Sequence, residues 1–269
     1  MNDPKTTRKT SQSEDTNPET RRLTAAEIFQ AAIENARDEL RRTNQKLAFS
    51  GVAGGLTMGL TALAVASVQA QMSSGSSQLA PYLLYPIGFI AVIIGRAQLF
   101  TENTLYPVIL VLDERKHVLR TLRLWGIVFA ANVMGALLFA LLAVKSAALR
   151  PGILAHLIDL GKEASFGTGA HFFWSGVIGG WLIALVAWTV TASHWTIGQM
   201  AIIYLLTFVV GIGHFAHCIA GSAEILSAVV DGSLSLGDYI RWLIPATSGN
   251  ICGGVLMVSL LNYGQVKTI

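Results

Sequence analysis

Apolar segments long enough to cross a lipid bilayer dominate the chain after residue 47. A bilayer core of about 30 Å needs about 20 mainly apolar residues in a helix. Hydrophobic residues make up 52% of the 269 and charged residues only 13%, which is typical of a membrane protein. We therefore predict an all-α membrane protein with six transmembrane helices, at residues 48–70, 81–110, 124–148, 170–192, 198–230 and 240–263.

The second and fifth segments are longer than a straight membrane helix requires. Each has polar or small residues near its middle, in "GRAQLFTENT" at 95–104 and in "HFAHCIAG" at 214–221. Irregular backbone is tolerated at membrane depth only where protein or a water-filled cavity surrounds it. We predict that both segments are broken helices.

The two halves of the chain share three landmarks in the same order. "SGVAGG" at 50–55 corresponds to "SGVIGG" at 175–180, "ANVMGALL" at 131–138 corresponds to "GNICGGVL" at 249–256, and a broken segment lies between them in each half. Three spans per half is an odd number, so the second half must enter the membrane from the opposite side. This pattern predicts two inverted three-helix repeats, with the conducting site where the broken helices meet near the bilayer midplane.

The amino-terminal part predicts the orientation of the protein. Basic residues gather before Leu47 and in "DERKHVLRTLR" at 113–123, so the amino terminus should be cytoplasmic; no signal peptide is visible. We predict a disordered cytoplasmic tail over 1–23, an amphipathic cytoplasmic helix over 24–46 and a channel domain over 47–269. Thr24 and Glu27 suit a capping box. The apolar stripe of the helix could lie on the membrane or pack on the bundle.

Several other functions find little support in the residues. No nucleophile, base and orienting group recur at a recognisable spacing, and no phosphate loop is visible, so we do not expect an enzyme or a cofactor. The basic residues of the tail are nearly matched by acidic ones, which argues against nucleic-acid binding. His214, His217 and Cys218 lack a further converging ligand, so no metal site is expected.

Four motifs together resemble the formate/nitrite transporter family. They are "LFT" at 99–101, "FAHCIA" at 215–220, the pattern of Trp125, Asn132 and Gly135, and "LIPATSGNICGG" at 243–254. The resemblance implies an aquaporin-like protomer of six helices in the bacterial cytoplasmic (inner) membrane. It also implies a homopentamer with one pore per protomer, and passage of small monovalent anions such as formate or nitrite.

By position, the resemblance assigns roles within the pore. Leu99 and Phe100 would narrow it, Thr101 would face its centre, and His217 would be the central histidine. Departures from the family pattern are Gln98 and Ala216, which replace acidic residues, and Glu102, which follows the loop threonine; Lys162 is only a candidate for the lysine expected at the outer approach. These departures resemble a less characterised branch of the family.

The chemistry of a weak acid suits such a pore. Moving a carboxylate into a low-dielectric constriction costs on the order of 20 kcal/mol in the idealised limit, whereas protonating it at pH 7 costs about 4 kcal/mol. His217, with an unperturbed pKa of about 6.5, could donate a proton or a hydrogen bond while Thr101 orients the anion. Alternatively, His217 is a neutral buried residue bonded to the break in its own helix.

Three further assignments stay open in the sequence. Asn132 and Asn250, at equivalent repeat positions, could tie down the broken helices or touch the substrate. Glu102 could pair with Arg96 and order its loop, or line the pore and change its selectivity; His214 could be structural or lie at the pore rim. The leading function is a channel or transporter for small weak-acid anions and protons. The alternatives are a channel for a neutral or other small solute, and a membrane scaffold or sensor that does not transport.

Overall fold

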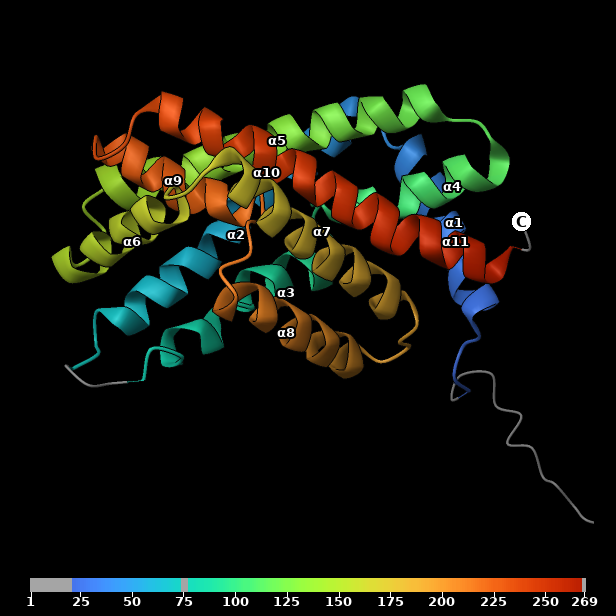
Figure 1. The fold of residues 1–269 in the computed structure, drawn as a ribbon, viewed down its shortest axis with the longest axis horizontal. Coiled ribbons are helices and arrows are strands. Elements are labelled where there is room, and N and C mark those ends of the chain that lie inside the picture. Colours follow the sequence, from blue (N-terminus) through green and yellow to red (C-terminus); the bar gives the residue numbers. More distant parts are fainter. Residues whose placement is uncertain (1–20, 74–76, 268–269) are drawn as a thin grey trace, which may run out of the picture.

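The computed structural model describes residues 21–73 and 77–267, and in these ranges all regular structure is helical (Figure 1). The elements are α1 (Ala25–Arg41), α2 (Asn44–Gln69), the 3-10 turn η1 (Ala80–Leu84), α3 (Ile87–Ile94), the 3-10 turn η2 (Glu102–Thr104), α4 (Tyr106–Glu114), α5 (Val118–Lys145), α6 (Pro151–Ala164), α7 (Gly169–Thr191), α8 (Thr196–Ile212), α9 (Ala220–Asp231), α10 (Leu236–Gly254), the π-helical turn η3 (Val255–Leu260) and α11 (Leu261–Val266). Most of the predicted tail, residues 1–20, lies outside the described residues.

Four helices in the described ranges are long and apolar enough to cross a membrane. They are α2, α5, α7 and the continuous run Leu236–Val266. The predicted second and fifth spans each consist of shorter helices, because the chain leaves helical conformation after Ile94 and again after Ile212. The all-α architecture of the prediction is therefore observed, with irregular segments where polar residues interrupt the apolar runs.

Glycines bring the long helices together in two pairs. A Cβ atom on Gly55 of α2 would lie 1.9 Å from the carbonyl oxygen of Asn132 in α5. In α7, a Cβ atom on Gly180 would lie 2.2 Å from the carbonyl oxygen of Asn250 in α10. Small residues allow this close backbone approach in helical membrane proteins. The α2–α5 pair and the α7–α10 pair are the most extensive helix contacts in the fold.

Helix α1 starts at the predicted capping box. The hydroxyl of Thr24 accepts a hydrogen bond from the backbone N–H of Glu27, and the Glu27 carboxylate accepts one from the backbone N–H of Thr24 at 2.8 Å. The box is thus confirmed. The helix ends at Arg41 and α2 begins at Asn44, so the chain turns before residue 46, the predicted end of the helix.

The apolar stripe of α1 packs on the bundle. Phe29 and Ile33 are each only 2% exposed, and the helix contacts α4 and α11 at one end of the molecule (Figure 1). The ammonium group of Lys267 lies 5.5 Å from the centre of the Phe29 ring. Of the two placements open to the stripe, packing against protein is the one found.

Helix α6 occupies residues that the sequence analysis treated as a link between spans. Pro151 stands in its first turn, where the fixed φ of proline suits a helix start. Its buried side, which includes Leu157 and Gly161, packs on α9 and α2, at the end of the molecule opposite α1. At fourteen residues the helix is too short to span a bilayer, so span length alone did not reveal it.

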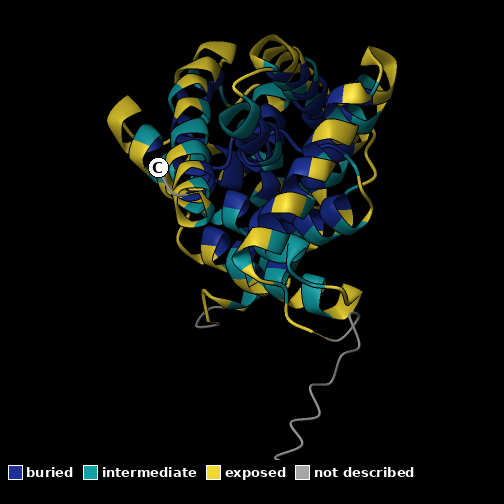
Figure 2. Ribbon diagram, turned by 90° about the vertical axis from the view of Figure 1, so that its right-hand side faces the viewer, coloured by how far each residue is buried: buried dark blue, intermediate teal, exposed yellow. Residues whose placement is uncertain are grey.

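Burial follows the pattern of a membrane bundle. Figure 2 shows buried residues at the centre and exposed residues on the outer helix faces. Many of the exposed residues are large and apolar, such as Phe49, Leu119 and Leu142. Large apolar residues exposed in such number are stable against lipid or another subunit rather than water.

Candidate transport site

The helices that precede the two irregular segments, α3 and α8, end in turns of the same geometry. After α3, Arg96 has a positive φ of 58°, and after α8, His214 has a φ of 50°. In each turn the next residue, Ala97 or Phe215, donates its backbone N–H to a carbonyl five residues earlier, at 3.0 Å and 3.1 Å respectively. The corresponding motifs of the two halves therefore share backbone geometry as well as sequence.

Asn132 ties down the segment after α3. Its side-chain oxygen accepts the backbone N–H of Phe100 at 2.8 Å. Its side-chain nitrogen donates to the carbonyl oxygens of Gly51 at 2.7 Å and Gln98 at 2.8 Å. One amide thereby satisfies two backbone groups that the interrupted helix leaves free, and it anchors them to the backbone of α2 at Gly51.

Asn250 makes the equivalent bonds in the second half. Its oxygen accepts the backbone N–H of Cys218 at 2.8 Å, and its nitrogen donates to the carbonyl oxygens of Gly176 and Ala216, both at 2.8 Å. Both asparagines are fully buried, and every one of these bonds goes to protein backbone. The geometry supports the helix-tying role considered for them.

Thr101 and His217 meet where the two segments approach each other. The Thr101 hydroxyl lies 2.8 Å from Nε2 of His217, and the two residues are 0% and 1% exposed. Nδ1 of His217 accepts the backbone N–H of Ala220 at 3.0 Å, in the first turn of α9. The two readings of this histidine therefore coincide, since its ring caps the break in its own helix and also faces Thr101.

These contacts define the proton position on the histidine ring. Because Nδ1 accepts a hydrogen bond, the ring proton of the neutral imidazole belongs on Nε2. Nε2 then donates to the Thr101 oxygen, which leaves the Thr101 hydroxyl hydrogen free to donate elsewhere. The Thr101 carbonyl accepts a bond from the Thr104 hydroxyl at 2.7 Å, which holds the loop threonine in place.

Leu99 and Phe100 are also buried, at 0% and 2% exposure. The Phe100 ring packs edge-on against Trp125 and Phe129, with centroid distances of 5.8 Å and 5.0 Å. Nε1 of Trp125 donates to the carbonyl oxygen of Asn103 at 2.8 Å. The Phe100 ring is thus held between the loop and α5.

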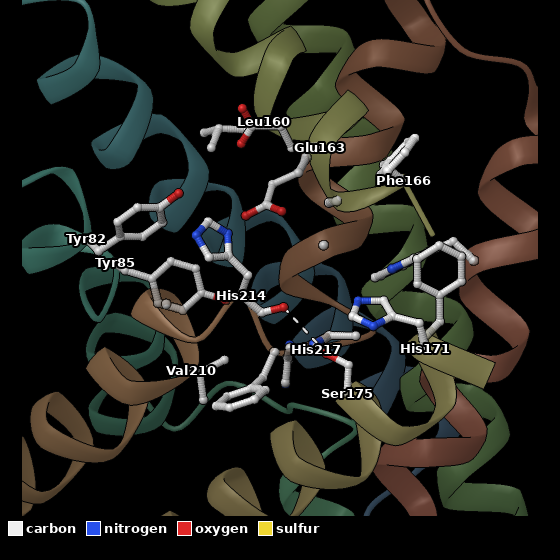
Figure 3. A pocket seen from close by; sticks show the side chains of 18 residues that line it. Tyr82, Tyr85, Leu160, Glu163, Phe166, His171, Ser175, Val210, His214 and His217 are labelled. Atoms are coloured by element: carbon white, nitrogen blue, oxygen red, sulfur yellow. Dashed lines mark hydrogen bonds between the residues drawn. The ribbon is translucent and has the colours of Figure 1, made fainter. Parts of the chain in front are cut away.

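A cavity of about 120 Å³ reaches His217 from the end of the molecule where α6 lies. Its lining includes Tyr82, Glu163, His214, His217 and Glu224, and we call it the histidine cavity. Figure 3 shows the side chains of Tyr82, Glu163 and His214 converging on one space. A buried water needs about 10–15 Å³ of such volume, so the cavity has room for several waters beside its carboxylates.

A second cavity, of about 150 Å³, lies on the side of α1. Its lining includes Glu39, Arg42, Arg96, Gln98 and Glu102, and we call it the arginine cavity. Glu39 and Arg42 pair with each other at 3.1 Å. Within the described ranges, Arg96 and Glu102 do not form the ion pair considered for them; both line the cavity instead.

The two cavities are built from corresponding positions. In the register that pairs Asn132 with Asn250, several residues of the arginine cavity match residues of the histidine cavity, namely Ile93 with Gly211, Arg96 with His214, Gln98 with Ala216, Asn103 with Gly221 and Tyr106 with Glu224. The histidine cavity reaches His217 itself, and the arginine cavity reaches Gln98 and Glu102, on either side of the segment that carries Thr101.

One candidate from the sequence lies elsewhere, and one residue that lines a cavity was missed. Lys162, considered for the outer approach, is exposed and pairs with Asp159 at 3.2 Å rather than lining the histidine cavity. The neighbouring Glu163 does line the histidine cavity. In the sequence, the only feature that pointed to Glu163 was its position beside Lys162 in a link between spans. Among the described residues no group of three histidines, cysteines or carboxylates is arranged for a metal ion.

A buried polar pair with a cavity towards each end, inside a bundle of apolar helices, is typical of a membrane transport protein. The sequence profile described as "Formate/nitrite transporter" matches residues 26–264, and the chain belongs to this family. The inner membrane protein YfdC of Escherichia coli (strain K12) is 32% identical over 251 residues, which cover 90% of this chain and 79% of that protein. A probable formate transporter of Methanothermobacter thermautotrophicus is 31% identical over 198 residues, covering 67% and 72%.

Solved structures of the family share the fold. An FNT family ion channel matches with a TM-score of 0.80 at 16% identity, covering 88% of this chain and 98% of that one. A pentameric formate channel with formate bound matches with a TM-score of 0.70 at 17% identity, covering 82% and 96%. At these identities the likeness shows the architecture alone and does not show the transported substrate.

Proposed function

We propose that this protein is a membrane channel or transporter for small monovalent weak-acid anions such as formate or nitrite. The observation that carries the proposal is the Thr101–His217 pair, a hydroxyl and an imidazole 2.8 Å apart, buried between two cavities. Relatives named for formate transport, and a formate-bound channel of the same fold, support the substrate class.

The proposed topology has six membrane spans in two inverted repeats of three. The second span combines α3 and α4 around the Thr101 loop, and the fifth combines α8 and α9 around His217. The matched hydrogen bonds of Asn132 and Asn250 support a duplication. Residues 47–269 would then form the channel domain and residues 24–46 a cytoplasmic segment docked beneath it.

The proposed mechanism uses a donated hydrogen bond at the narrowest point. With Nε2–H of His217 directed at the Thr101 oxygen, the Thr101 hydroxyl donates to an oxygen of the passing anion. Leu99 and Phe100 exclude water beside it. A hydrogen bond to a charged acceptor contributes about 1.5–3 kcal/mol, so this donor offsets part of the cost of losing water.

Transfer of a proton from solvent lowers the remaining barrier. Protonating a carboxylate of pKa about 4 at pH 7 costs about 4 kcal/mol, whereas dehydrating the bare anion costs on the order of 20 kcal/mol in the idealised limit. Both cavities have room for water, which would give solvent protons access to the anion near the constriction. Flux should therefore rise as the pH on the anion side falls.

The proposed assembly is a homopentamer in the bacterial inner membrane, with the amino terminus in the cytoplasm. The pentameric relative and the inner membrane protein of Escherichia coli support this assignment. The basic residues near α1 and between α4 and α5 support the orientation. The exposed apolar faces of the bundle would then contact lipid and neighbouring protomers.

A second candidate is a channel of the same fold for a neutral solute. Glu102 in the arginine cavity and Glu163 and Glu224 in the histidine cavity favour it, because these carboxylates repel anions at both entrances. Waters in the cavities reduce that repulsion, which is why the anion remains the first choice. Glu102→Gln would change substrate preference only if this carboxylate acts on the passing solute.

Stopped-flow transport in proteoliposomes tests the proposal. The solutes are formate, nitrite, acetate and glycerol, applied to wild-type protein, His217→Ala and the exposed control His194→Ala. Protein-dependent anion flux that rises at lower external pH, falls in His217→Ala and is unchanged in His194→Ala supports a weak-acid channel. Flux of glycerol alone supports the neutral-solute channel, and no flux of any solute indicates a scaffold or sensor.

A further inference from the structure

Arg96 has an unusual backbone conformation at the edge of the arginine cavity. Its φ of 58° lies in the left-handed region, where an L residue meets a steric cost that glycine avoids. Such strain is typically retained at functional sites. The other non-glycine residues with positive φ in the described ranges are Arg115, His117, Ala147 and His214. Among these five residues only Arg96 and His214 line one of the two cavities.

The matching position in the other cavity also holds a side chain that can be cationic. Arg96 and His214 occupy the same turn after α3 and after α8, and each faces the cavity on its own side. Glycine would fit either turn with less strain. A basic group retained twice, at a conformational cost, indicates a shared task at the two entrances.

The charge balance of the arginine cavity leaves the Arg96 guanidinium available. The two other charged groups near α1, Glu39 and Arg42, neutralise each other in an ion pair with an N–O distance of 3.1 Å. The remaining carboxylate, Glu102, makes no ion pair with Arg96 in the described part of the chain. The cavity volume of about 150 Å³ leaves space for a small ligand and several waters beside the guanidinium.

We propose that Arg96 is an anion-docking residue that holds a small carboxylate in the arginine cavity before or after it passes Thr101. A guanidinium presents parallel N–H groups that match both oxygens of a carboxylate. Gln98 and Glu102, which line the same cavity, flank the segment 99–101. An anion at Arg96 therefore lies beside the loop that carries Thr101. This inference rests on the proposed weak-acid transport.

Glycine is the informative substitution because it removes the charge and also relieves the strain. Arg96→Gly should raise the half-saturating formate concentration for flux by about tenfold, the effect of losing one charge-assisted hydrogen bond. Its thermal midpoint should be unchanged or higher. Arg96→Lys, which keeps the charge, should stay within about threefold of wild type, since lysine loses the bidentate geometry only. If Arg96 had only a structural role, its replacement would instead lower the midpoint of thermal unfolding.

Arg115→Gly is the matched control. Arg115 has a similar φ of 53° but caps α4 in an exposed turn and lines neither cavity. Its replacement should leave the formate dependence unchanged. Glu102→Gln adds a test of sign: for an anion site, losing this negative charge lowers the half-saturating concentration. If Glu102→Gln raises it while Arg96→Gly lowers it, the cavity holds a cation and the proposal is overturned.

Chemical modification separates this inference from the transport proposal. Phenylglyoxal reacts with arginine, and mass spectrometry of the purified protein gives its rate at Arg96 and at Arg115. Formate should slow modification of Arg96 and not of Arg115. Protection of Arg96 without formate flux would support the anion site and refute formate transport. Normal flux without protection, or an unchanged half-saturating concentration in Arg96→Gly, would refute the anion site alone.

Discussion

The hydroxyl of Thr101 lies 2.8 Å from Nε2 of His217, while Nδ1 of the same ring accepts the backbone N–H of Ala220 at 3.0 Å. A single imidazole thus joins the two irregular segments and caps the first turn of α9. Because the helix supplies the donor to Nδ1, the histidine presents its ring proton to Thr101. The direction of the Nε2–H donor therefore depends on the first turn of α9 keeping its place beside the ring.

Replacing Thr101 separates its hydroxyl from its shape. Thr101→Val keeps the volume but removes the donor, and formate flux should fall at least about tenfold, because a hydrogen bond to a charged acceptor contributes about 1.5–3 kcal/mol. Thr101→Ser keeps the hydroxyl and should retain most of the flux. Stopped-flow pH change in proteoliposomes measures both variants. Equal flux in Thr101→Val and wild type would show that the hydroxyl does not act on the anion.

Removing either helix-tying asparagine should destabilise the fold strongly. Asn132→Ala leaves the N–H of Phe100 and the carbonyl of Gln98 without their partner, and the Gly51 carbonyl, which lies inside α2, loses a second bond. At about 1–3 kcal/mol for each buried unsatisfied group, the loss should be at least about 2 kcal/mol. Asn250→Ala should behave alike. Thermal unfolding in detergent, followed by circular dichroism, measures the effect.

Asn262→Ala provides the control for this comparison. Asn262 is half-buried and makes one side-chain bond, to the carbonyl oxygen of Val258 at 2.9 Å. Its replacement should cost no more than about 1 kcal/mol. If Asn132→Ala and Asn262→Ala unfolded at the same temperature, the three bonds of Asn132 would stabilise the fold no more than the single bond of Asn262.

Methyl groups at the helix crossings should force the long helices apart. Gly55→Ala places a Cβ atom 1.9 Å from the Asn132 carbonyl oxygen, and Gly180→Ala places one 2.2 Å from the Asn250 carbonyl oxygen. Both contacts are with backbone, so overpacking should cost about 1–3 kcal/mol or more. Gly126 of α5 has nothing within 4 Å of such a Cβ, and Gly126→Ala should be neutral or stabilising. Thermal unfolding of the three variants measures these costs. A similar loss of stability in all three variants would contradict the role of Gly55 and Gly180 in helix packing.

The Glu27 carboxyl in the capping box of α1 should titrate at low pH. Hydrogen bonds from the backbone and side chain of Thr24, with a further contribution from Arg21, lower the pKa of Glu27 to about 2. A carboxyl whose pKa is lower in the folded state favours folding above its ordinary value of 4.5, and this contribution disappears as the pH falls towards 2. Carboxyl NMR titration should show the pKa of Glu27 rising towards 4.5 in Thr24→Ala. An unchanged pKa would mean that the box does not form in solution.

Sequence reasoning was effective where the signal was local or repeated. The apolar runs predicted the long helices, and polar residues within the second and fifth runs predicted the irregular segments around Thr101 and His217. Spacing predicted the capping box of Thr24 and Glu27, which is confirmed. The resemblance predicted the family, which the profile match over residues 26–264 confirms. The six-span inverted topology and the roles of Leu99, Phe100 and Glu102 stay predictions.

Other features depended on which segments meet in space. Helix α6 was missed because a short amphipathic helix between spans lacks the apolar length that marks the others. Glu163 became a candidate only when α6 brought it to the cavity that reaches His217. The pairing of Glu102 with Arg96 was plausible by proximity in sequence, yet in the described part of the chain the two residues line a shared cavity without forming an ion pair.

The sequence by itself determined the membrane class, the positions of the breaks and the duplicated motifs, because hydropathy and periodicity are properties of consecutive residues. Only the tertiary structure decided that the ring of His217 bonds both Thr101 and Ala220, and that one asparagine in each half holds three backbone groups. Except for the His217–Ala220 bond, those contacts join residues far apart in the chain. They exist because close-packed helices leave the broken segments no water to satisfy their backbone, so side chains of distant helices must do it.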